Sequence, residues 1–342
     1  MTPFAHKLLT WYDSHQRDLP WRKISDAYRI WVSEIILQQT RVAQGYEYYL
    51  RFIETFPTVQ DLASADEDEV LRLWQGLGYY SRARNMHTAA KQIVSLGCFP
   101  TDYEGVRALK GIGDYTAAAI CSFAFGLPCA VLDGNVYRIL SRYFGIETPI
   151  DCSKGKKEFF QVAQALLPIH HSAEYNQAIM DFGALQCVPK SPKCSQCPLV
   201  DSCVANNEMR IEELPVKAHR TKVIERFFVY INVRTPEGEW LHRRSSGDIW
   251  QGLYEYPLLE FTHKPTLTEV LEHPFIQALP KGFVICLRKE NLKHILTHRI
   301  IWADAYSLTY DFNVVPIEDY KVVCSDKLSE YGMSKLQQII MK

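Results

Sequence analysis

Four cysteines close together near the middle of the chain constrain its fold more than any other feature. Cys187, Cys194, Cys197 and Cys203 follow the spacing C-x6-C-x2-C-x5-C. Four thiolates in one short loop are the ligand set of a 4Fe–4S cluster. Zinc also accepts four thiolates but usually collects them as two C-x2-C pairs, and only one such pair is present. The spacing therefore favours a 4Fe–4S cluster over zinc, disulfides or four unrelated core cysteines.

The length and composition of the chain indicate two globular domains. At 342 residues it exceeds what one hydrophobic core usually serves. Its 47% hydrophobic and 23% charged residues are an ordinary globular mixture. The formal net charge is −1, so a polyanionic partner would need a local basic surface.

No segment of the sequence indicates export or a membrane span. Residues 115–132 carry no charge, but their alanines, Gly126 and Pro128 predict a buried helix rather than a membrane span. The N-terminus has no export signal, and the six remaining cysteines have no framework spacing. We therefore expect a cytoplasmic protein with reduced thiols.

Helical periodicity dominates residues 1–204, which predict an all-α domain. One helix is expected near Phe4 to Tyr12, and further helices are expected over residues 28–38, 42–56, 61–74, 81–96, 115–125, 135–143, 156–167 and 173–186. Residues 205–223 are mostly polar, contain one proline and predict a linker.

Residues 224–342 predict a separate α+β domain. β-Branched and aromatic runs at 226–234 and 239–244 surround a turn-like Pro-Glu-Gly segment and indicate a hairpin. Further strands are expected at 300–310 and 320–324. Thr266-x-x-Glu269 is a capping box that opens a helix to about residue 273.

A glycine-rich turn, Leu109-Lys-Gly111-Ile-Gly113, separates two expected helices. The two glycines let the backbone turn tightly and bring N–H groups up to a ligand without side-chain obstruction. N–H groups at a helix N-terminus suit a phosphate, so this segment is interpreted as a helix–hairpin–helix that grips a DNA backbone. An ordinary glycine turn is the alternative. Asp114 would repel a phosphate unless it faces away or a cation intervenes.

Two carboxyl groups in different surroundings indicate acid–base chemistry. Glu34 is a lone acid on an apolar helix, so its pKa should be raised and it should keep its proton near neutral pH, as a general acid requires. Asp133 directly follows an apolar run, where a carboxylate is costly unless it is used or paired. Such a pair cleaves acetal C–N or C–O bonds through an oxocarbenium-like state. A solvated helix charge at Glu34 and a helix N-cap at Asp133 are the alternatives.

The segment Gly76-Leu-Gly-Tyr79-Tyr80-Ser-Arg82-Ala-Arg84 is an aromatic and basic turn. A turn of this kind can wedge a DNA duplex and contact its phosphates. A glycine C-cap followed by an ordinary helix start is the alternative interpretation.

Taken together, these segments resemble the helix–hairpin–helix DNA glycosylase superfamily with its iron–sulfur loop, and within it the adenine DNA glycosylases of the MutY type. The resemblance is close over residues 10–204 and loose over the rest. It rests on the cysteine loop and, in order, on Leu19-Pro-Trp-Arg22, Trp31-Val-Ser-Glu34, Leu37-Gln-Gln-Thr40, Gly76-Leu-Gly-Tyr-Tyr80, Leu132-Asp-Gly-Asn135 and Asn176-Gln-Ala178.

The resemblance implies a monomeric base-excision-repair enzyme that hydrolyses the N-glycosidic bond of adenine opposite 8-oxoguanine or guanine in double-stranded DNA. It implies that Glu34 protonates the purine, while Asp133, assisted by Tyr115 and Asn135, stabilises the sugar cation. The residues implied for the adenine pocket are Trp21, Arg22, Gln177 and Asp181. The residues implied to contact DNA are Gln39, Thr40, Tyr79, Gly111, Gly113, Thr297 and His298.

One position discriminates within the superfamily. The endonuclease III branch carries a lysine nucleophile in the hairpin, where this chain has Tyr115. Without that amine no Schiff base forms. The resemblance therefore implies a monofunctional glycosylase with little or no strand-cleaving lyase activity.

Residues 224–342 resemble the Nudix-like domain with which MutY-type enzymes read 8-oxoguanine. Gly252-Leu-Tyr-Glu-Tyr-Pro257 is similar to the segment before a Nudix box, but the R-E-x-x-E-E metal carboxylates do not follow, so pyrophosphohydrolase activity is not expected. The family's Phe-Ser-His loop is Leu296-Thr297-His298 here. This change keeps a hydroxyl and the histidine and loses the aromatic ring.

Two other functions are compatible with parts of the sequence. A thymine mismatch glycosylase of the same superfamily can also carry a tyrosine at the lysine position, although the long C-terminal region argues against it. A non-catalytic iron–sulfur DNA-binding protein would need neither Glu34 nor Asp133. The two carboxyl groups therefore argue against the non-catalytic alternative.

Overall fold

The computed structural model describes residues 1–219, 223–317 and 319–342. The chain divides into two compact units. Unit 1 consists of residues 1–64 and 88–220, and unit 2 consists of residues 65–87 and 221–342. The predicted linker includes residues 220–222, which lie outside the described residues.

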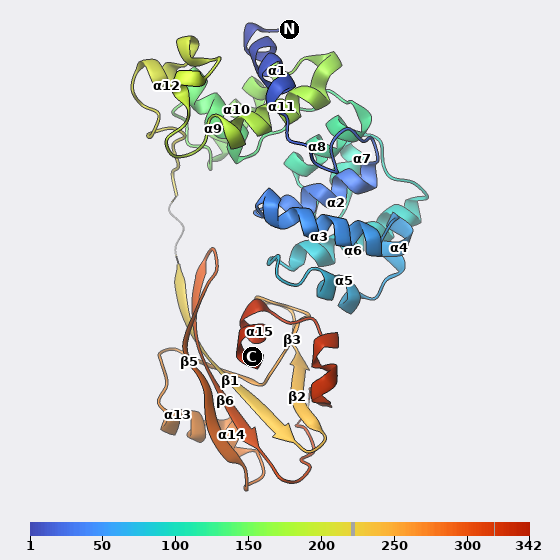
Figure 1. Cartoon of the computed structure of the whole chain (residues 1–342), viewed down its shortest axis with the longest axis vertical. Coiled ribbons are helices and arrows are strands. Elements are labelled where there is room, and N and C mark those ends of the chain that lie inside the picture. The colour runs from blue at the N-terminus through green and yellow to red at the C-terminus, as the bar shows by residue number, and fades with distance from the viewer. Residues whose placement is uncertain (220–222, 318) are drawn as a thin grey trace. The chain divides into compact units, whose positions relative to one another are not determined.

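The described part of unit 1 is built from helices (Figure 1). Helix α6, Ser81–Leu96, starts in unit 2 and ends in unit 1. The other helices of unit 1 are α1 Pro3–His15, α2 Ala27–Leu37, α3 Val42–Thr55, α4 Val59–Ser64, α7 Tyr103–Ala108, α8 Asp114–Phe125, α9 Gly134–Phe144, α10 Ser153–Leu166, α11 Ser172–Leu185 and α12 Val204–Asn207.

Short polar residues set where several of these helices begin. The side chains of Thr2, Asp26, Asp102 and Asp133 each accept a hydrogen bond from a backbone N–H in the first turn of α1, α2, α7 and α9. Such caps satisfy N–H groups that have no partner inside the helix. The starts of α2, which carries Glu34, and of α9, which Asp133 caps, are therefore fixed by local sequence.

Helix α8 is the buried helix expected in the uncharged segment 115–132. It ends at Gly126, which takes the left-handed conformation with φ 66°, because glycine does so without a Cβ penalty. The rest of the segment is extended and leads to Asp133. No helix in the described ranges is long and apolar enough to cross a membrane.

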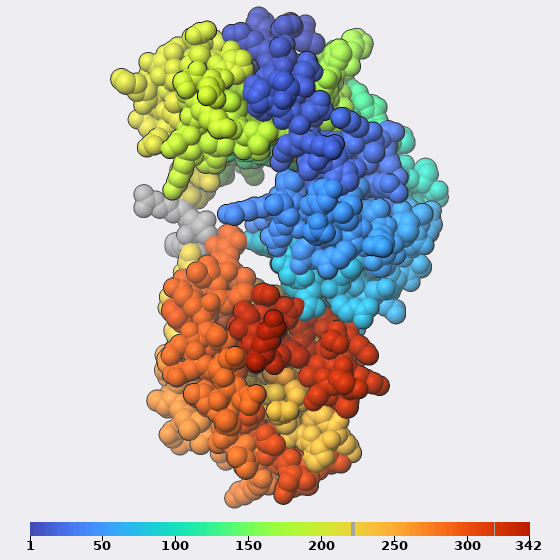
Figure 2. Space-filling view, viewed as in Figure 1, coloured from blue at the N-terminus to red at the C-terminus, as the bar shows by residue number. Residues whose placement is uncertain are grey.

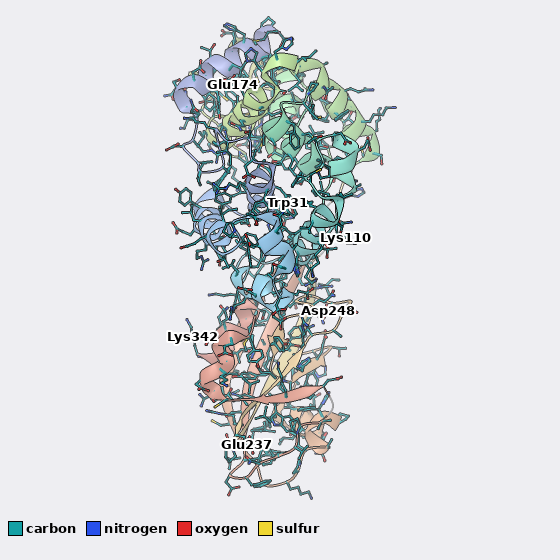
Figure 3. The ribbon with its side chains drawn as sticks, turned by 90° about the vertical axis from the view of Figure 1, so that its right-hand side faces the viewer. Trp31, Lys110, Glu174, Glu237, Asp248 and Lys342 are labelled. Atoms are coloured by element: carbon teal, nitrogen blue, oxygen red, sulfur yellow. The ribbon has the colours of Figure 1, made fainter. Side chains whose placement is uncertain are left out.

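The core of unit 1 joins helices that are distant in sequence. Trp11 of α1 packs edge-on against Phe182 of α11, with ring centroids 4.9 Å apart. The small residues Ala118 and Ala119 of α8 belong to the same buried cluster as Ile139 of α9. Trp31 of α2 is also fully buried, and Figure 3 labels it inside the helical unit. Helices α8, α9 and α11 therefore meet around one core.

The predicted helix over residues 61–74 is wrong as a single element. The structure has α4, which ends at Ser64, and α5, Glu67–Leu73. The first turn of α5 contains three acids, Glu67, Asp68 and Glu69. Acids stabilise a helix N-terminus through its dipole, so this charge run favours a new helix start.

Seven strands among the described residues of unit 2 form one mixed sheet (Figure 1). The main strand order is β3-β2-β1-β6-β5, with β4 paired to β1 and β7 paired to β2. Strands β1 and β6 run parallel and all other pairs are antiparallel. The strands are β1 Ile224–Thr235, β2 Gly238–Arg243, β3 Tyr254–Glu255, β4 Leu258–Phe261, β5 Val284–Ile295, β6 Arg299–Thr309 and β7 Tyr320–Val323.

Helices cover both faces of this sheet. Val229 and Ile231 of β1 pack with residues of α13, Leu267–Glu272, and α14, Pro274–Gln277. Tyr230, between them in sequence, packs in a second cluster with α15, Lys335–Met341. Successive side chains of a strand point to opposite faces, so the sheet is buried on both sides. This α+β architecture confirms the fold class expected for residues 224–342.

The sequence predicted β1, β2, β6, β7 and the capping box at Thr266 but missed β3, β4 and β5. The capping box is present, with Thr266 and Glu269 each bonding the other's backbone N–H. Among the described strands β5 pairs with β6 alone, and most of its residues are exposed. An edge strand of mixed polarity lacks the regular alternation that signals a half-buried strand.

Residues 65–87 pack within unit 2. Arg243 of β2 forms ion pairs with Glu67 at 3.0 Å and Asp68 at 2.8 Å. The Tyr254 hydroxyl donates to Asp68 at 3.2 Å, and the Tyr80 hydroxyl donates to the backbone oxygen of Met333 at 3.4 Å. Nothing in the sequence pattern predicted that α5 and the start of α6 associate with the C-terminal sheet.

Candidate active site

Glu34 lies in the third turn of α2 and is nearly buried, with 7% of its surface exposed. Burial raises the pKa of Glu34 to about 7, since it penalises the charged form. The Tyr115 hydroxyl donates to Glu34 Oε2 at 2.8 Å and opposes this shift, as does the charge of Arg22. The nearby negative charge of Asp133 raises the pKa of Glu34 further. Glu34 can therefore hold a proton near neutral pH.

Asp133 is the N-cap of α9. This is the capping role expected from the sequence as the alternative to a catalytic role. Its Oδ1 accepts hydrogen bonds from the backbone N–H of Asn135 at 2.9 Å and of Val136 at 2.8 Å. Its Oδ2 accepts from Asn135 Nδ2 at 2.7 Å. Burial raises the pKa of Asp133, and these three donors oppose the shift. Within the described residues the buried Glu34 and the half-buried Asp133 thus differ in the number of donors that each receives, three for Asp133 and one for Glu34.

Asn135 links Asp133 to the cysteine loop. The Asn135 Oδ1 accepts from Arg138 Nη2 at 2.9 Å, and Arg138 Nε donates to the backbone oxygen of Cys187 at 2.7 Å. A Cβ added to Gly183 of α11 would stand 2.5 Å from the Asn135 Cβ, so only glycine allows this approach of α11 to α9. Sequence reasoning missed Arg138, because an arginine one turn along an amphipathic helix normally indicates a solvated face.

A small cavity lies beside Glu34, and three of the four residues predicted for the adenine pocket line it. They are Trp21, Arg22 and Gln177. Sequence reasoning missed most of the other lining residues, which are Arg17, Leu19, Ile30, Ser33, Leu37, Val42, Phe123 and Met180. Most of them are apolar residues of separate helices, which look like core in sequence, whereas Arg17 and Leu19 come from the loop between α1 and α2.

Asp181, the fourth residue predicted for the pocket, is not among those that line the cavity. It is fully buried and bonds two arginines, Arg17 Nε at 2.9 Å and Arg22 Nη2 at 2.9 Å. Arg22 also donates to the Tyr12 hydroxyl at 2.6 Å and to Gln177 Oε1 at 3.2 Å. Asp181 therefore holds Arg22 at the cavity rather than forming its wall.

The four cysteines surround a second cavity in unit 1. Cys187, Cys194, Cys197 and Cys203 all line it, together with Arg142 of α9. Arg142 Nη1 lies 3.5 Å from Cys187 Sγ and donates to the backbone oxygen of Val188, while Nη2 donates to the backbone oxygen of Pro189. Among the described residues no three His, Cys, Asp or Glu side chains are close enough to hold a single metal ion.

The loop is at the surface of unit 1, where Figure 2 shows its yellow-green segment beside the dark blue α1. Leu199 of this loop and Phe4 of α1 belong to one buried cluster. Four thiols that converge on one cavity, with a cation beside them, fit a cluster whose thiolate ligands carry net negative charge.

The predicted hairpin is the turn between α7 and α8. Gly111 has a left-handed φ of 79°, whereas Gly113 is extended, so only Gly111 requires glycine for its backbone angles. A Cβ at Gly113 would meet nothing within 4 Å, which leaves its backbone open to a ligand. Asp114 accepts from Arg107 Nε at 2.6 Å, which provides the neighbouring cation that a phosphate site would need. Lys110 of the same turn is exposed, as Figure 3 shows.

Gln39 and Tyr79 both have left-handed backbones, with φ 55° and φ 46°. Such angles are strained for residues with a Cβ and are often found at functional sites. Gln39 is exposed and Thr40 is half-buried. In unit 2 the exposed ring of Tyr79 hydrogen-bonds through its hydroxyl to Thr297 Oγ1. The structure thus brings together two of the predicted DNA contacts from distant parts of the sequence.

Thr297 and His298 lie in the turn between β5 and β6. The Leu296 N–H donates to the Arg299 backbone oxygen at 2.8 Å, and the Ile224 N–H donates to the His298 oxygen at 3.0 Å. These bonds fix the backbone of the turn at its base and leave the Thr297 side chain bonded to Tyr79.

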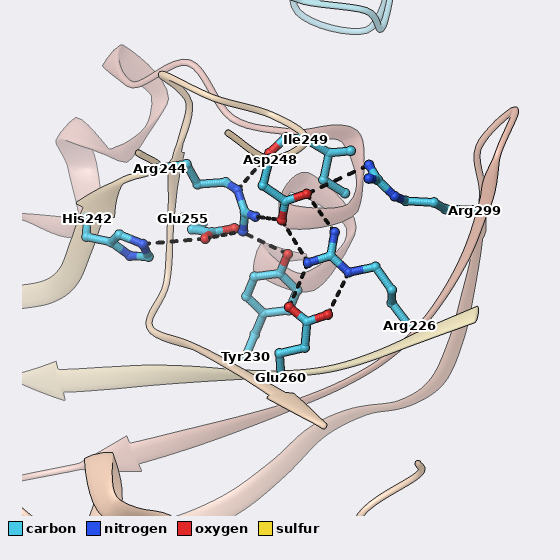
Figure 4. A network of polar contacts seen from close by, with 9 residues as sticks. All are labelled: Arg226, Tyr230, His242, Arg244, Asp248, Ile249, Glu255, Glu260 and Arg299. Carbon is cyan, nitrogen blue, oxygen red and sulfur yellow. Dashed lines mark hydrogen bonds and ion pairs between the residues drawn. The ribbon is translucent and has the colours of Figure 1, made fainter. Parts of the chain in front are cut away.

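A cluster of charges adjoins the same turn (Figure 4). Three arginines, Arg226, Arg244 and Arg299, converge on the carboxylate of Asp248. Arg226 and Arg244 make contacts of 2.7 Å, whereas Arg299 lies 3.7 Å away. Asp248 therefore joins the start of β6 to β1 and to the end of β2.

Comparison with known proteins agrees with this geometry. Residues 32–167 match the HhH-GPD superfamily of base excision DNA repair proteins, and residues 187–203 match the iron–sulfur binding domain of endonuclease III. A solved thermostable thymine-DNA glycosylase is similar with a TM-score of 0.56 and 28% identity, covering 60% of this chain and 95% of that chain. The protein is thus an iron–sulfur DNA glycosylase of base excision repair.

Two relatives define the family more narrowly. The adenine DNA glycosylase of Schizosaccharomyces pombe is 36% identical over 406 residues, which cover 97% of this chain and 87% of that protein. The adenine DNA glycosylase of Buchnera aphidicola subsp. Schizaphis graminum is 37% identical over 257 residues, 74% of each chain. The chain belongs to the adenine DNA glycosylase family. It is a hydrolase that releases adenine from DNA, and its four-cysteine loop binds a 4Fe–4S cluster.

We predict that Asp181→Asn destabilises the protein by about 3 kcal/mol, because it removes the charge of a fully buried carboxylate that pairs with the half-buried Arg17 and Arg22. The free energy of unfolding in urea measures this loss. Asp26→Asn is the matched control: its ion pair with Arg29 is half exposed and asparagine still caps α2, so its effect should stay below about 0.5 kcal/mol. Equal losses of unfolding free energy in Asp181→Asn and Asp26→Asn would show that burial of an ion pair does not determine its contribution to stability.

Proposed function

We propose that this adenine DNA glycosylase acts on adenine paired with 8-oxoguanine and that it has no lyase activity. The catalytic part of this proposal rests on the Glu34 carboxyl, which is buried beside the cavity and accepts a hydrogen bond from Tyr115. Asp133 lies nearby and accepts three hydrogen bonds. In this proposal residues 1–204 carry the catalysis and residues 205–223 form a linker. Residues 224–342 form a Nudix-like domain that reads the base opposite adenine.

In the proposed reaction the adenine leaves the duplex and enters the cavity lined by Trp21, Arg22 and Gln177. Flipping costs a few kcal/mol, and less for a mispaired base. Glu34 then donates its proton to the purine, at N7, so that the base leaves as a neutral molecule when the C–N bond breaks.

The positive charge that remains on the sugar is stabilised by the charged form of Asp133, which its three hydrogen-bond donors favour against the effect of burial. A water oxygen then bonds to the sugar carbon and the water releases a proton, which restores charge balance and gives an abasic site. Tyr115 and Asn135 orient the two carboxyl groups. Tyr115 has no amine, so a covalent Schiff base with the sugar does not form.

The iron–sulfur cluster, held by Cys187, Cys194, Cys197 and Cys203, supplies a rigid brace rather than a reacting group. Arg138 connects its loop to Asn135 and so to Asp133. The hairpin with Gly111 and Gly113, and the residues Gln39 and Thr40, are proposed DNA contacts. The protein is proposed to work as a monomer in the cytoplasm, where it reaches chromosomal DNA.

The decisive experiment offers the enzyme three duplexes, with A opposite 8-oxoguanine, A opposite G and T opposite G. We expect abasic sites first in the A·8-oxoguanine duplex, and strand breaks only after alkali treatment. Glu34→Gln should bind this duplex normally but lose about 10²–10⁴-fold in single-turnover rate. Breaks without alkali would contradict the monofunctional assignment, and a near-normal rate for Glu34→Gln would remove Glu34 from catalysis.

The rate should fall as pH rises through about 7, because the reactive form of Glu34 is the protonated one. Tyr115→Phe removes a hydrogen bond that lowers the pKa of Glu34, so its rate should fall only at higher pH. Single-turnover rates measured between pH 5 and 9 test this, and Tyr143→Phe, whose hydroxyl bonds Ser202, should keep the wild-type profile. A Tyr115→Phe profile that moves to lower pH would contradict the proposed role of the bond.

Thr297→Val keeps the shape of the side chain and removes the hydroxyl that bonds Tyr79. If this hydroxyl helps to read 8-oxoguanine, the preference for A·8-oxoguanine over A·G should drop by roughly 2–10-fold, the value of one hydrogen bond. The ratio of kcat/KM on the two duplexes measures this. Thr262→Val, in an exposed loop, serves as control. An unchanged ratio in Thr297→Val would rule out the proposed reading.

A further inference from the structure

Two side-chain amides hold the segment that leads to Asp133. Ala130 and Val131 of this segment are buried, with 4% and 1% of their surfaces exposed. Buried backbone N–H and C=O groups need hydrogen-bond partners, and among the described residues of unit 1 no β-strand provides them. Gln164 of α10 and Asn176 of α11 provide them instead.

Gln164 bonds the backbone on both sides of Cys129. Its Oε1 accepts from the Ala130 N–H at 3.1 Å, and its Nε2 donates to the Pro128 oxygen at 2.8 Å. A neighbouring β-strand also offers one acceptor and one donor to the chain beside it. The half-buried amide of Gln164 therefore does for this segment what a strand does in a sheet.

Asn176 makes the same pair of bonds one residue further along the chain. Its Oδ1 accepts from the Val131 N–H at 3.2 Å, and its Nδ2 donates to the Cys129 oxygen at 2.8 Å. Nδ2 also donates to Ser122 Oγ of α8 at 2.8 Å. Successive residues of a β-strand bond alternately to the neighbour on either side. The two amides thus take the place of two neighbouring strands, one contributed by α10 and one by α11.

These bonds support both carboxyl groups of the candidate active site. Val131 lies two residues before Asp133, so a shift of the segment also shifts the Asp133 carboxylate. Asn176 is only 1% exposed, and it ties the segment to α8 as well. Helix α8 carries Tyr115, whose hydroxyl bonds Glu34. One asparagine therefore connects the supports of the two groups.

We propose that Gln164 and Asn176 are positioning residues for adenine release and that they act through Asp133. Neither is among the residues that line the cavity beside Glu34. They hold residues 128–131 so that the Asp133 carboxylate stands where positive charge develops on the sugar. This inference rests on the proposed function, because it assumes that the charge of Asp133 acts in the reaction.

Gln164→Met removes both bonds from α10 and keeps a side chain of similar length. Its single-turnover rate on an A·8-oxoguanine duplex should fall about 10–10²-fold, the loss expected when a reacting group is misplaced by about 1 Å. Its Kd for the same duplex should stay at the wild-type value. Gln161→Met changes an exposed residue of the same helix. This matched control should keep the wild-type rate.

Asn176→Asp keeps the acceptor for the Val131 N–H and turns the donor that faces the Cys129 oxygen into a second acceptor. Two acceptors repel each other, so the segment should shift and the single-turnover rate should fall at least as far as in Gln164→Met. Because Gln164 is only half-buried, Gln164→Met keeps the proposal testable should Asn176→Asp fail to fold.

A double-mutant cycle separates positioning from a general loss of structure. Gln164→Met should slow the wild-type enzyme but leave the low residual rate of Asp133→Asn unchanged, because the charge through which Gln164 acts is already gone. A loss by the same factor in both backgrounds would overturn the inference, because it would show that Gln164 does not act through Asp133.

Two further outcomes separate this inference from the proposed function. Wild-type rates in folded Gln164→Met and Asn176→Asp, together with a crippled Asp133→Asn, would overturn the inference alone. A wild-type rate in Asp133→Asn would overturn the proposed role of that carboxylate, and the inference with it.

Discussion

The hydrogen bonds from the first turn of α9 to the Asp133 carboxylate are the interaction on which the rest of the site depends. The Asp133 side chain caps α9 and also supplies a carboxyl group to the candidate active site. The same helix carries Asn135 and Arg138, which reach α11 and the cysteine loop. Because Gly183 lets α11 approach Asn135 closely, the cap, the helix packing and the cluster loop form one connected set of contacts.

The proposed chemistry follows from a difference between the buried carboxyl group of Glu34 and the half-buried carboxyl group of Asp133. Both lie in surroundings that penalise charge, yet Asp133 receives three donors and Glu34 receives one. For Glu34 the change in pKa from 4.5 to about 7 corresponds to roughly 3 kcal/mol in favour of the protonated form. In the proposed mechanism Glu34 therefore holds the proton, and the donors around Asp133 favour its charged form, without a difference in their intrinsic chemistry.

Several features of the fold and of the candidate site could be predicted from the sequence, because they depend on residues that are close together in the chain. The cysteine spacing, the glycine turn before α8 and the lone acid on α2 each depend on residues within a few turns of one another. The sequence could not predict Arg138, Met180 or Phe123, whose roles arise only when separate helices pack. It also missed β5, an exposed edge strand, and gave no sign that Asp181 would lie behind the pocket, since burial between two arginines is a tertiary property.

The association of residues 65–87 with the C-terminal sheet has a consequence for how the chain is made. Arg243 and its partner Glu67 are 176 residues apart, so on the ribosome α5 emerges long before the strands that it contacts. Closing so long a loop is slow compared with forming local helices. The bonds of Asp68 to Tyr254 and of Tyr80 to Met333 can form only when synthesis is nearly complete. The contacts of this early segment with the C-terminal sheet are therefore among the last to form.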